Sequence, residues 1–425
     1  MRFVPHSKQE KEEMLKGAKV SSIEELFKDI PQKLFLKEGL KLGKGLSEME
    51  LQHELQELSS KNRQLKLFLG AGCYSHFIPA AVPAIVGRSE FYTAYTPYQP
   101  EMSQGMLQAI YEWQTYICLL TGMDVANASM YDGASACAEA MLMAVASTRK
   151  KKVAIAKGLN PQYRETVETY ANVNGIEIIE VEVNADMEIE EDTACVIAQN
   201  PDFFGRIAKL KELSEKAHAK GALLVVAVTE ALSLAFAEKP VDYDADIVAM
   251  EAQSFGNAMS FGGPHAGVIA CNAKFVRQIP GRLVGKTVDS GGKEGFILTL
   301  QAREQHIRRE NAGSNICSNQ ALCALASTVY LSVVGENGLK ELAIQNHENA
   351  KYLAEKLVEK GFELPKGEDF FNEFVVKAKD ARQLQEKLLE KGFAFGHLLS
   401  ENELLVAVTE MNSKEEIDEL VGALQ

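Results

Sequence analysis

The chain has 425 residues, 46% of them hydrophobic and 24% charged, which is ample material for a large buried core. This composition excludes disordered chains, collagen-like chains and small disulfide scaffolds. The formal net charge of −14 repels nucleic acid and anionic lipid over long range, so neither is expected as a partner.

The first stretch, residues 1–63, is predicted to be a helical and highly charged arm with short turns. Ser22 with Glu25, and Ser47 with Glu50, have the spacing of capping boxes that begin helices. The second of these helices carries three leucines on one face, Leu51, Leu55 and Leu58. Such an arm cannot form its own core, so it must lie on the main domain or on a partner.

The middle stretch, residues 64–330, alternates short apolar runs with helical segments, which is typical of a sheet buried on both faces. The apolar runs predict strands at 153–156, 176–181, 194–198, 223–228, 247–250 and 268–270. Helices are predicted at 161–173 and 206–220. The class is therefore α/β.

The last stretch, residues 331–425, has the pattern of a small α+β domain. Helices are predicted over 340–360, over 380–391 and after residue 413, and strands near 374–376 and 404–408. Gly361 and Gly392 close the first two helices as C-cap glycines, and Ser413 with Glu416 opens the third.

Cysteine usage and hydropathy indicate the compartment. The seven cysteines lie mostly inside apolar runs, which is typical of reduced core thiols in a cytoplasmic protein. No Cys/His group has zinc spacing, so no metal site is predicted. No apolar run has the length of a membrane span, and the polar N-terminus lacks the apolar stretch of a signal peptide.

Two segments upstream of the first predicted strand stand out. Residues 90–105 carry four aromatic side chains and two prolines without helical or strand periodicity. Tyrosines on a rigid backbone suit the grip of a small polar ligand, although a packed surface loop explains the pattern equally well. The glycine-rich stretch 68–82 contains His76, for which a structural role is the simpler interpretation.

Two other segments have the chemistry of anion sites. Asp132, Gly133 and Ser135 open a helix of small residues, where backbone N–H groups can approach an anion, with tight helix–sheet packing as the alternative. Residues 303–310 hold three arginines ahead of a Ser/Asn-rich stretch. These arginines could bind a carboxylate or phosphate group. The alternative is that they form a solvent-exposed face of a helix.

Residues 251–267 follow a predicted strand and consist mostly of small residues and glycines. In one class of pyridoxal phosphate (PLP) enzymes, such a strand-end loop carries the Schiff-base lysine just before a glycine-rich stretch. No lysine lies between Lys239 and Lys274.

Together the motifs resemble the glycine decarboxylase P-protein family of the glycine cleavage system, over essentially the whole chain. They occur in the order FLGAGCYSHFIP, YTAYTPYQPEMSQG, LTGMDVANASMYDGASACAEAM, SFGGPHAG and AREQHIRRENAGSNICSNQAL. The length and the first residues are similar to the N-terminal (α) subunit of the form in which this protein is two homologous chains.

The resemblance implies a fold-type I, PLP-transferase-like large domain over residues 64–330, with a mixed seven-stranded sheet, and a small domain over 331–425. It implies an α2β2 assembly in which subunit 2 carries PLP, decarboxylates glycine and passes the aminomethyl group to the lipoyl arm of the H-protein. Aligned on the shared GGP, Ser254 falls near the lysine position and Val228 near that of the acid that holds the pyridine nitrogen. No catalytic residue is therefore expected from this chain.

The resemblance also implies a contribution to a shared pocket from Tyr95, Tyr98, Gln99, Glu101, Ser103 and His76. The tyrosines would supply walls and hydroxyl groups, Gln99 an amide, and Glu101 an acid near the substrate amine or the lipoyl dithiolane. Candidate anion contacts are Asp132, Gly133, Ser135, Arg308 and Asn315.

Three residues depart from the family pattern. Asn311 and Gly313 stand where the family commonly has Lys and Thr, and Ser75 where it often has Asp. They favour an alternative in which the chain is a non-catalytic scaffold or regulatory subunit. A further alternative is a self-sufficient PLP enzyme that uses Lys157, Lys274, Lys286 or Lys293.

Overall fold

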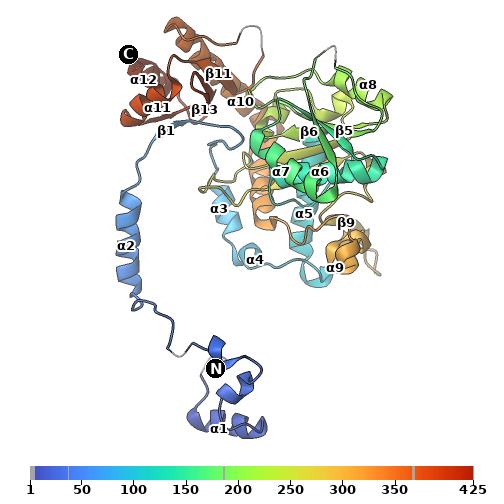
Figure 1. The fold of residues 1–425 in the computed structure, drawn as a ribbon, viewed down its shortest axis with the longest axis vertical. Helices are drawn as coiled ribbons and strands as arrows, with labels where there is room; N and C mark the ends of the chain where they lie inside the picture. The colour runs from blue at the N-terminus through green and yellow to red at the C-terminus, as the bar shows by residue number, and fades with distance from the viewer. Residues whose placement is uncertain (1–4, 37, 185–186, 366–368, 425) are drawn as a thin grey trace. The chain divides into compact units, whose positions relative to one another are not determined.

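The computed structural model describes residues 5–36, 38–184, 187–365 and 369–424. It divides into two units, Met1–Arg63 and Gln64–Gln425, each of which is described by itself (Figure 1).

The first unit, the N-terminal arm, has two α-helices, α1 (Lys8–Gly17) and α2 (Glu48–Ser60), and two 3₁₀ turns, η1 (Glu24–Phe27) and η2 (Gln32–Leu34). Neither α-helix buries a residue, and the three leucines of the α2 face are about half exposed. No other described element of the arm therefore covers the apolar face of α2.

One of the two capping boxes predicted in the arm is present. Ser47 and Glu50 exchange side-chain and backbone hydrogen bonds at the start of α2. The box predicted at Ser22 is wrong, because the Glu25 carboxylate accepts instead from the backbone N–H of Ser21 at 3.2 Å. The segment therefore makes only the single 3₁₀ turn η1, without a side-chain cap.

The second unit is built on a seven-stranded mixed sheet in the order β2-β8-β7-β6-β5-β3-β4. Its strands are β2 (Val125–Ala126), β3 (Lys152–Ala156), β4 (Glu177–Val181), β5 (Thr193–Gln199), β6 (Leu223–Val228), β7 (Ile247–Glu251) and β8 (Gly267–Cys271). Strands β3 to β7 run parallel, whereas β8 is antiparallel to β7 and to β2. The α/β class and the mixed seven-stranded sheet are confirmed.

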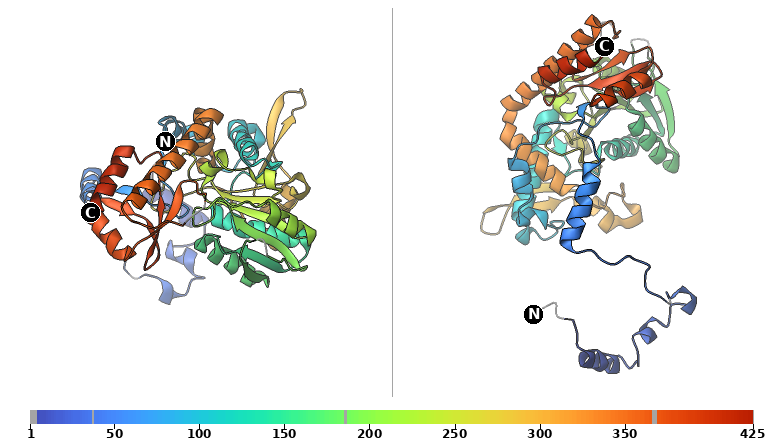
Figure 2. Two further views of the ribbon diagram at one scale, coloured as in Figure 1. Left: turned by 90° about the horizontal axis from the view of Figure 1, so that it is seen from above. Right: turned by 90° about the vertical axis from the view of Figure 1, so that its left-hand side faces the viewer.

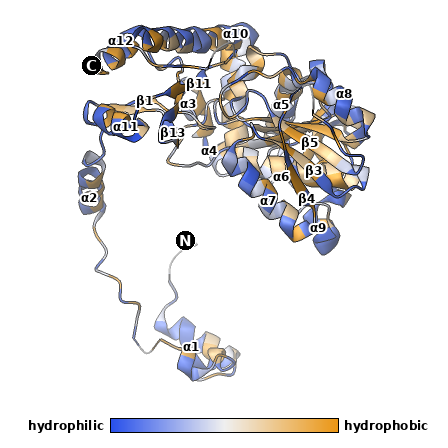
Figure 3. Ribbon diagram, turned by 45° about the horizontal axis from the view of Figure 1, so that its top comes forward, coloured by the Kyte–Doolittle hydropathy of each residue, from blue (hydrophilic) through white to orange (hydrophobic). Residues whose placement is uncertain are grey.

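Helices cover both faces of this sheet, and successive strand residues alternate between the two layers. In β6, Val226 and Val228 face the layer of α5 (Gln104–Thr121), α8 (Lys211–Ala219) and the first half of α10 (Ala321–Glu359). Val225 and Ala227 face the layer of α6 (Gly133–Thr148) and α7 (Pro161–Asn174). The strands are apolar along their length (Figure 3), as the sequence predicts for a doubly covered sheet.

Two helices differ from the sequence prediction. α8 begins at Lys211 rather than at Arg206, because the Asp202 carboxylate accepts from the backbone N–H groups of Phe204 and Arg206 and holds a turn there. α10 begins at Ala321 rather than at residue 340. Its two halves meet at a kink at Gly335, whose φ of +65° is favourable only for glycine.

By length and composition, α10 is the one described helix that could cross a membrane. Its first half, however, is packed in the layer beside the large sheet, where Ala324, Leu325 and Tyr330 are buried. This is the burial of a core helix.

The C-terminal part of this unit has the sheet β11-β14-β13, all antiparallel, and a parallel pair β1-β12. Its strands are β1 (Lys66–Phe68), β11 (Glu373–Lys377), β12 (Phe393–Phe395), β13 (His397–Ser400) and β14 (Glu403–Ala407). Helices α11 (Ala381–Glu390), α12 (Lys414–Ala423) and the second half of α10 pack on these strands (Figure 2). Strand β1 thus joins the small domain although it precedes the large sheet in the chain.

The remaining elements connect these layers. They are α3 (Ala81–Val86), α4 (Ser89–Tyr92), the hairpin of β9 (Leu283–Val288) and β10 (Glu294–Thr299), α9 (Gln305–Arg308), and 3₁₀ turns at Pro100–Met102, Ala231–Ala235, Pro240–Tyr243, Ala273–Phe275, Gln301–Arg303 and Arg309–Asn311.

A buried ion cluster ties the large sheet to the C-terminal part of the second unit. His76 lies between Glu230, which follows β6, and Glu410, which follows β14, with Nε2–Oε2 and Nδ1–Oε2 distances of 3.0 and 2.9 Å. Glu410 also accepts from the backbone N–H of Phe77 and from the Asn346 amide on α10. We call His76, Glu230 and Glu410 the interdomain clamp.

The clamp is almost dry, since the side chains of its three members are 2%, 2% and 7% exposed. Burial lowers the pKa of His76, but the two carboxylates outweigh it and raise that pKa to about 10. Burial raises the pKa of Glu410, but the hydrogen bond and charge of His76 outweigh it and lower that pKa to about 2. At neutral pH the imidazole is therefore a cation.

Replacing His76 is expected to be strongly destabilising. His76→Gln leaves two buried carboxylates without a cation, a change that costs about 3–5 kcal/mol in comparable pairs. Urea denaturation measures the change in the free energy of unfolding. Lys340→Gln, which removes only the exposed pair with Glu336 on α10, serves as the control and should behave like wild type. A His76→Gln protein as stable as wild type would mean that the clamp does not contribute to the free energy of unfolding.

The same clamp predicts a pH dependence. Because the folded pKa of His76 is raised to about 10 from an ordinary 6.5, its contribution is complete below pH 6.5 and is lost as pH rises toward 10. The difference in unfolding free energy between wild type and His76→Gln should therefore shrink between pH about 7.5 and about 9.5. Urea denaturation of both proteins at the two pH values measures it, and a constant difference would contradict a charged imidazole.

Candidate functional site

The carboxyl-terminal ends of β5, β6 and β7 meet the N-terminus of α6 at one edge of the large sheet. Open parallel sheets bind their ligands at this edge, because strand ends and helix N-termini converge there. We call this region the carboxyl edge; it comprises Gln199, residues 228–230, residues 251–254 and residues 132–135. It is the first place to test for a cofactor.

Two acidic side chains cap the N-terminus of α6. Asp132, the N-cap residue, accepts from the backbone N–H of Ser135 at 2.7 Å, as the sequence led us to expect for a helix start. Gly133 donates its backbone N–H to the Glu251 carboxylate at 2.9 Å. The same carboxylate accepts from the backbone N–H groups of Gln253 and Ala266, at 3.0 and 3.1 Å. The sequence analysis did not single out Glu251.

The two positions that the motif alignment singled out also lie at this edge. Ser254 follows β7 by three residues and is 3% exposed. Val228 is the last residue of β6 and is fully buried opposite Met250 of β7. Both positions therefore have the strand-end placement that the alignment implies.

PLP needs a lysine amine for its aldehyde, an acid for its ring nitrogen and donors for its phosphate. At the carboxyl edge of this chain, Ser254 offers no amine for the PLP aldehyde and Val228 offers no acid for the ring nitrogen. The backbone N–H groups of Gly133, Gln253 and Ala266, which could serve the phosphate, are already bonded to Glu251. The residues at this edge therefore do not fit PLP.

The loop 70–76 fills much of the space above the strand ends. The Gln253 amide makes two hydrogen bonds of 3.0 Å with the backbone of Tyr74. The Tyr74 hydroxyl donates to the Glu373 carboxylate at 2.9 Å, and Ala71 donates its backbone N–H to the same group at 2.6 Å. Burial raises the pKa of Glu373 to about 8. The loop is thus fixed to both domains.

The four lysines of the self-sufficient PLP alternative are all on the surface. Lys157, Lys274 and Lys286 form ion pairs with Glu182, Asp246 and Glu294, and their side chains are about half exposed. Lys293 is exposed as well. None of the four amines is buried at the carboxyl edge, which disfavours that alternative.

The aromatic loop predicted to contribute to a pocket is exposed in this chain. Tyr95 is 84% exposed and Tyr98 43%, while Gln99 and Glu101 are also exposed and Ser103 is half-buried. The loop is nevertheless anchored. The buried Arg282 donates to the Tyr98 hydroxyl at 3.1 Å and places its guanidinium 5.5 Å from the ring centre. His76, in contrast, has both ring nitrogens engaged in the interdomain clamp.

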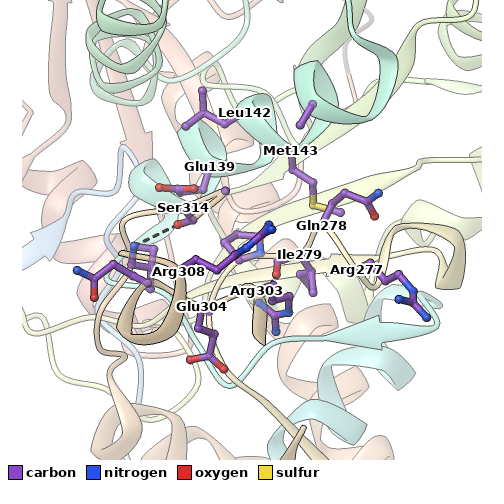
Figure 4. A pocket seen from close by; sticks show the side chains of 16 residues that line it. Glu139, Leu142, Met143, Arg277, Gln278, Ile279, Arg303, Glu304, Arg308 and Ser314 are labelled. Atoms are coloured by element: carbon purple, nitrogen blue, oxygen red, sulfur yellow. Dashed lines mark hydrogen bonds between the residues drawn. The ribbon is translucent and has the colours of Figure 1, made fainter. Parts of the chain in front are cut away.

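A separate cavity of about 150 Å³ lies beside α6, near the arginines of residues 303–310 (Figure 4). Arg308, a predicted anion contact, lines it, as do Gly313 and Arg303. Among the described residues, two buried guanidinium nitrogens of Arg303 find no hydrogen-bond partner, although the third donates to the Ile279 carbonyl. The other predicted contact here, Asn315, is exposed.

Glu139 also lines this cavity, and sequence reasoning missed it. Burial raises its pKa to about 7. The available signal was an acid in the middle of a run of small residues that forms α6. The cavity therefore offers guanidinium donors and a carboxyl group that can exchange a proton near neutral pH.

Residues 1–424 match the family model for the glycine cleavage system P-protein. The chain is 51% identical to the probable glycine dehydrogenase (decarboxylating) subunit 1 of Desulforamulus reducens, over 445 aligned residues. It is 49% identical to the protein of the same name from Carboxydothermus hydrogenoformans, over 441. Both alignments cover 100% of this chain and 99% of the relative.

Solved structures agree with this relationship. A glycine decarboxylase (P-protein) of the glycine cleavage system, in inhibitor-bound form, superposes with a TM-score of 0.93 at 42% identity, covering 100% of this chain and 99% of that one. A sphingosine-1-phosphate lyase of Burkholderia pseudomallei, 14% identical over 92% of both chains, shares the fold with a TM-score of 0.65. As its motifs predict, the chain belongs to the glycine cleavage system P-protein family.

Proposed function

We propose that this chain is the cofactor-free subunit of a glycine dehydrogenase (decarboxylating), and that a second, homologous subunit holds PLP. One observation carries the proposal: Ser254, which the motif alignment sets near the Schiff-base lysine, is buried three residues after β7. A hydroxyl group cannot form an imine, and the decarboxylation of glycine needs an electron sink of the kind that PLP supplies. That chemistry therefore belongs to the partner chain.

In this proposal the chain acts through the surface it offers to subunit 2. The exposed aromatic loop supplies the hydroxyl groups of Tyr95 and Tyr98, the Gln99 amide and the Glu101 carboxylate. Arg282 fixes the loop from below through Tyr98, so its side chains are ordered before a partner arrives. Glu101 would face the substrate amine or the lipoyl dithiolane.

The proposed assembly is an α2β2 heterotetramer in the cytoplasm, and the acceptor of the aminomethyl group is the lipoyl arm of the H-protein. The name subunit 1, carried by relatives that this chain matches end to end, supports the existence of a partner subunit. The acidic composition supports a protein-only assembly without nucleic acid or membrane.

A scaffold or regulatory role is the second candidate, and the three departures from the family pattern favour it. Asn311 is exposed and Gly313 lines the arginine cavity, while the Ser75 carbonyl accepts from the Thr409 hydroxyl. Mixing the chain with subunit 2 separates the two candidates. Glycine–CO2 exchange that appears only in the mixture supports the catalytic role, whereas equal exchange by subunit 2 alone supports the scaffold.

The chain is expected not to form a covalent PLP adduct at a single lysine. Since the motif alignment sets Ser254 near the lysine position and Lys157 and Lys274 lie on the surface, borohydride reduction in the presence of PLP should give no stoichiometric pyridoxyl-lysine on peptide mapping. Subunit 2, treated in parallel, is the positive control. One fully labelled lysine in this chain would overturn the division of labour.

Tyr95→Phe and Tyr98→Phe are expected to slow glycine–CO2 exchange in the reconstituted complex. Loss of one hydrogen bond to a bound group costs about 0.5–1.5 kcal/mol, which is roughly a threefold to tenfold fall in rate at subsaturating glycine. Tyr95→Phe should leave the melting temperature unchanged, because the side chain is 84% exposed. Tyr92→Phe, 67% exposed on α4, is the matched control. Wild-type exchange by both variants would leave the loop a structural role only.

A further inference from the structure

Glu251 makes an unusual set of contacts for the last residue of a sheet strand. Its carboxylate accepts three backbone N–H groups, from Gly133 at 2.9 Å, Gln253 at 3.0 Å and Ala266 at 3.1 Å. Both carboxylate oxygens are used, and the residue is 3% exposed. His265 lies nearby, with its Nδ1 4.0 Å from the carboxylate.

These donors come from three different segments of the chain: the first turn of α6, the turn after β7 and the residue before β8. Backbone N–H groups that converge at a helix N-terminus favour an anion, since the helix dipole adds positive potential there. Such a set of donors suits the oxygens of a phosphate or sulfate group. In this chain the donors are bonded to a carboxylate that the chain itself supplies.

The segments that supply these donors are closely packed around two glycines. A Cβ at Gly133 would lie 2.0 Å from the Tyr163 hydroxyl and 2.9 Å from the Glu251 Cβ. A Cβ at Gly267 would lie 2.1 Å from the Asp132 carbonyl. An incoming anion would have to displace the Glu251 carboxylate from the three N–H groups that it already bonds.

We propose that Glu251 is a built-in anion that occupies an inherited phosphate cradle, and that it excludes phosphorylated ligands from this chain. Loss of the lysine prevents a covalent link to PLP, whereas Glu251 prevents even non-covalent docking of its phosphate. The proposal rests on the proposed function only in naming PLP as the excluded cofactor. The cradle itself, once emptied, would take phosphate or sulfate.

Glu251→Ala empties the cradle and tests the proposal. The variant should melt below wild type, and inorganic phosphate, titrated at constant ionic strength, should raise its melting temperature by about 2 °C or more in a saturable manner. Wild type should not respond. Glu373→Ala is the matched control, because Glu373 is also a buried carboxylate that accepts a backbone N–H, but not from a helix N-terminus. It should be destabilised and unresponsive to phosphate.

The ligand class is tested with a pair of compounds. Pyridoxine 5′-phosphate, which lacks the reactive aldehyde, should stabilise Glu251→Ala, whereas pyridoxine should not. If Glu251→Ala does not fold in chloride buffer, a refolding experiment replaces the melting experiment. Glu251→Ser and Glu251→Ala are each refolded in phosphate buffer and in chloride buffer of equal ionic strength. The yield of soluble protein is expected to be higher in phosphate.

A phosphate response in wild type, an equal response in Glu373→Ala, or no phosphate effect on either Glu251 variant would overturn the proposal. The proposed decarboxylase function is judged separately. Wild-type chain mixed with subunit 2 is assayed for glycine–CO2 exchange, and that result does not depend on the phosphate titrations.

Discussion

The second unit depends on one buried cation. His76 meets Glu230 and Glu410 in a nearly dry environment, where either carboxylate alone would be costly to bury. The three groups come from the loop after β1, the end of β6 and the end of β14, and Asn346 adds a contact from α10. Because each carboxylate needs the same imidazolium, the large sheet, the small domain and the helix that links them are fixed by a shared requirement for charge balance.

Buried acids accept hydrogen bonds at the carboxyl edge and in the loop 70–76. In a sheet of this kind, strand ends and helix N-termini present donors that a bound cofactor would otherwise satisfy. Here Glu251 accepts from the start of α6, and Glu373 accepts from Ala71 and Tyr74. Glu251 thus bonds three N–H groups at the edge, and Glu373 bonds the loop beside it, without any group from outside the chain.

Sequence periodicity predicted the layers of the sheet because the central strands β5, β6, β7 and β8 are mostly apolar and buried. The strands β3 to β8 fall within one or two residues of the predicted runs. Helix starts were less predictable where a side chain competes for the backbone, as Asp202 does before α8 and Glu25 does near Ser21. Local spacing contains no information about which of two competing acceptors will capture an N–H group.

The candidate site shows the same limit. Motif spacing identified Ser254 and Val228, since both lie at strand ends that the sequence marks clearly. It could not identify Glu251 as a partner of Gly133, because the two residues are far apart in the chain and no periodicity connects them. The pairing of His76 with Glu410 is likewise long-range. Contacts of this kind follow from the completed topology rather than from any segment within it.

The pairing of β1 with β12 affects how the chain can be made. Lys66–Phe68 leaves the ribosome long before its partner Phe393–Phe395 is synthesised. Phe68 is fully buried in the core that the C-terminal strands and helices form. It therefore lacks its packing partners until those segments have been synthesised. Pairings between segments far apart in the chain form slowly, so the large sheet can assemble first while β1 is still unpaired. This core is thus completed only after Phe393–Phe395 has emerged, which makes its closure a later step than the assembly of the large sheet.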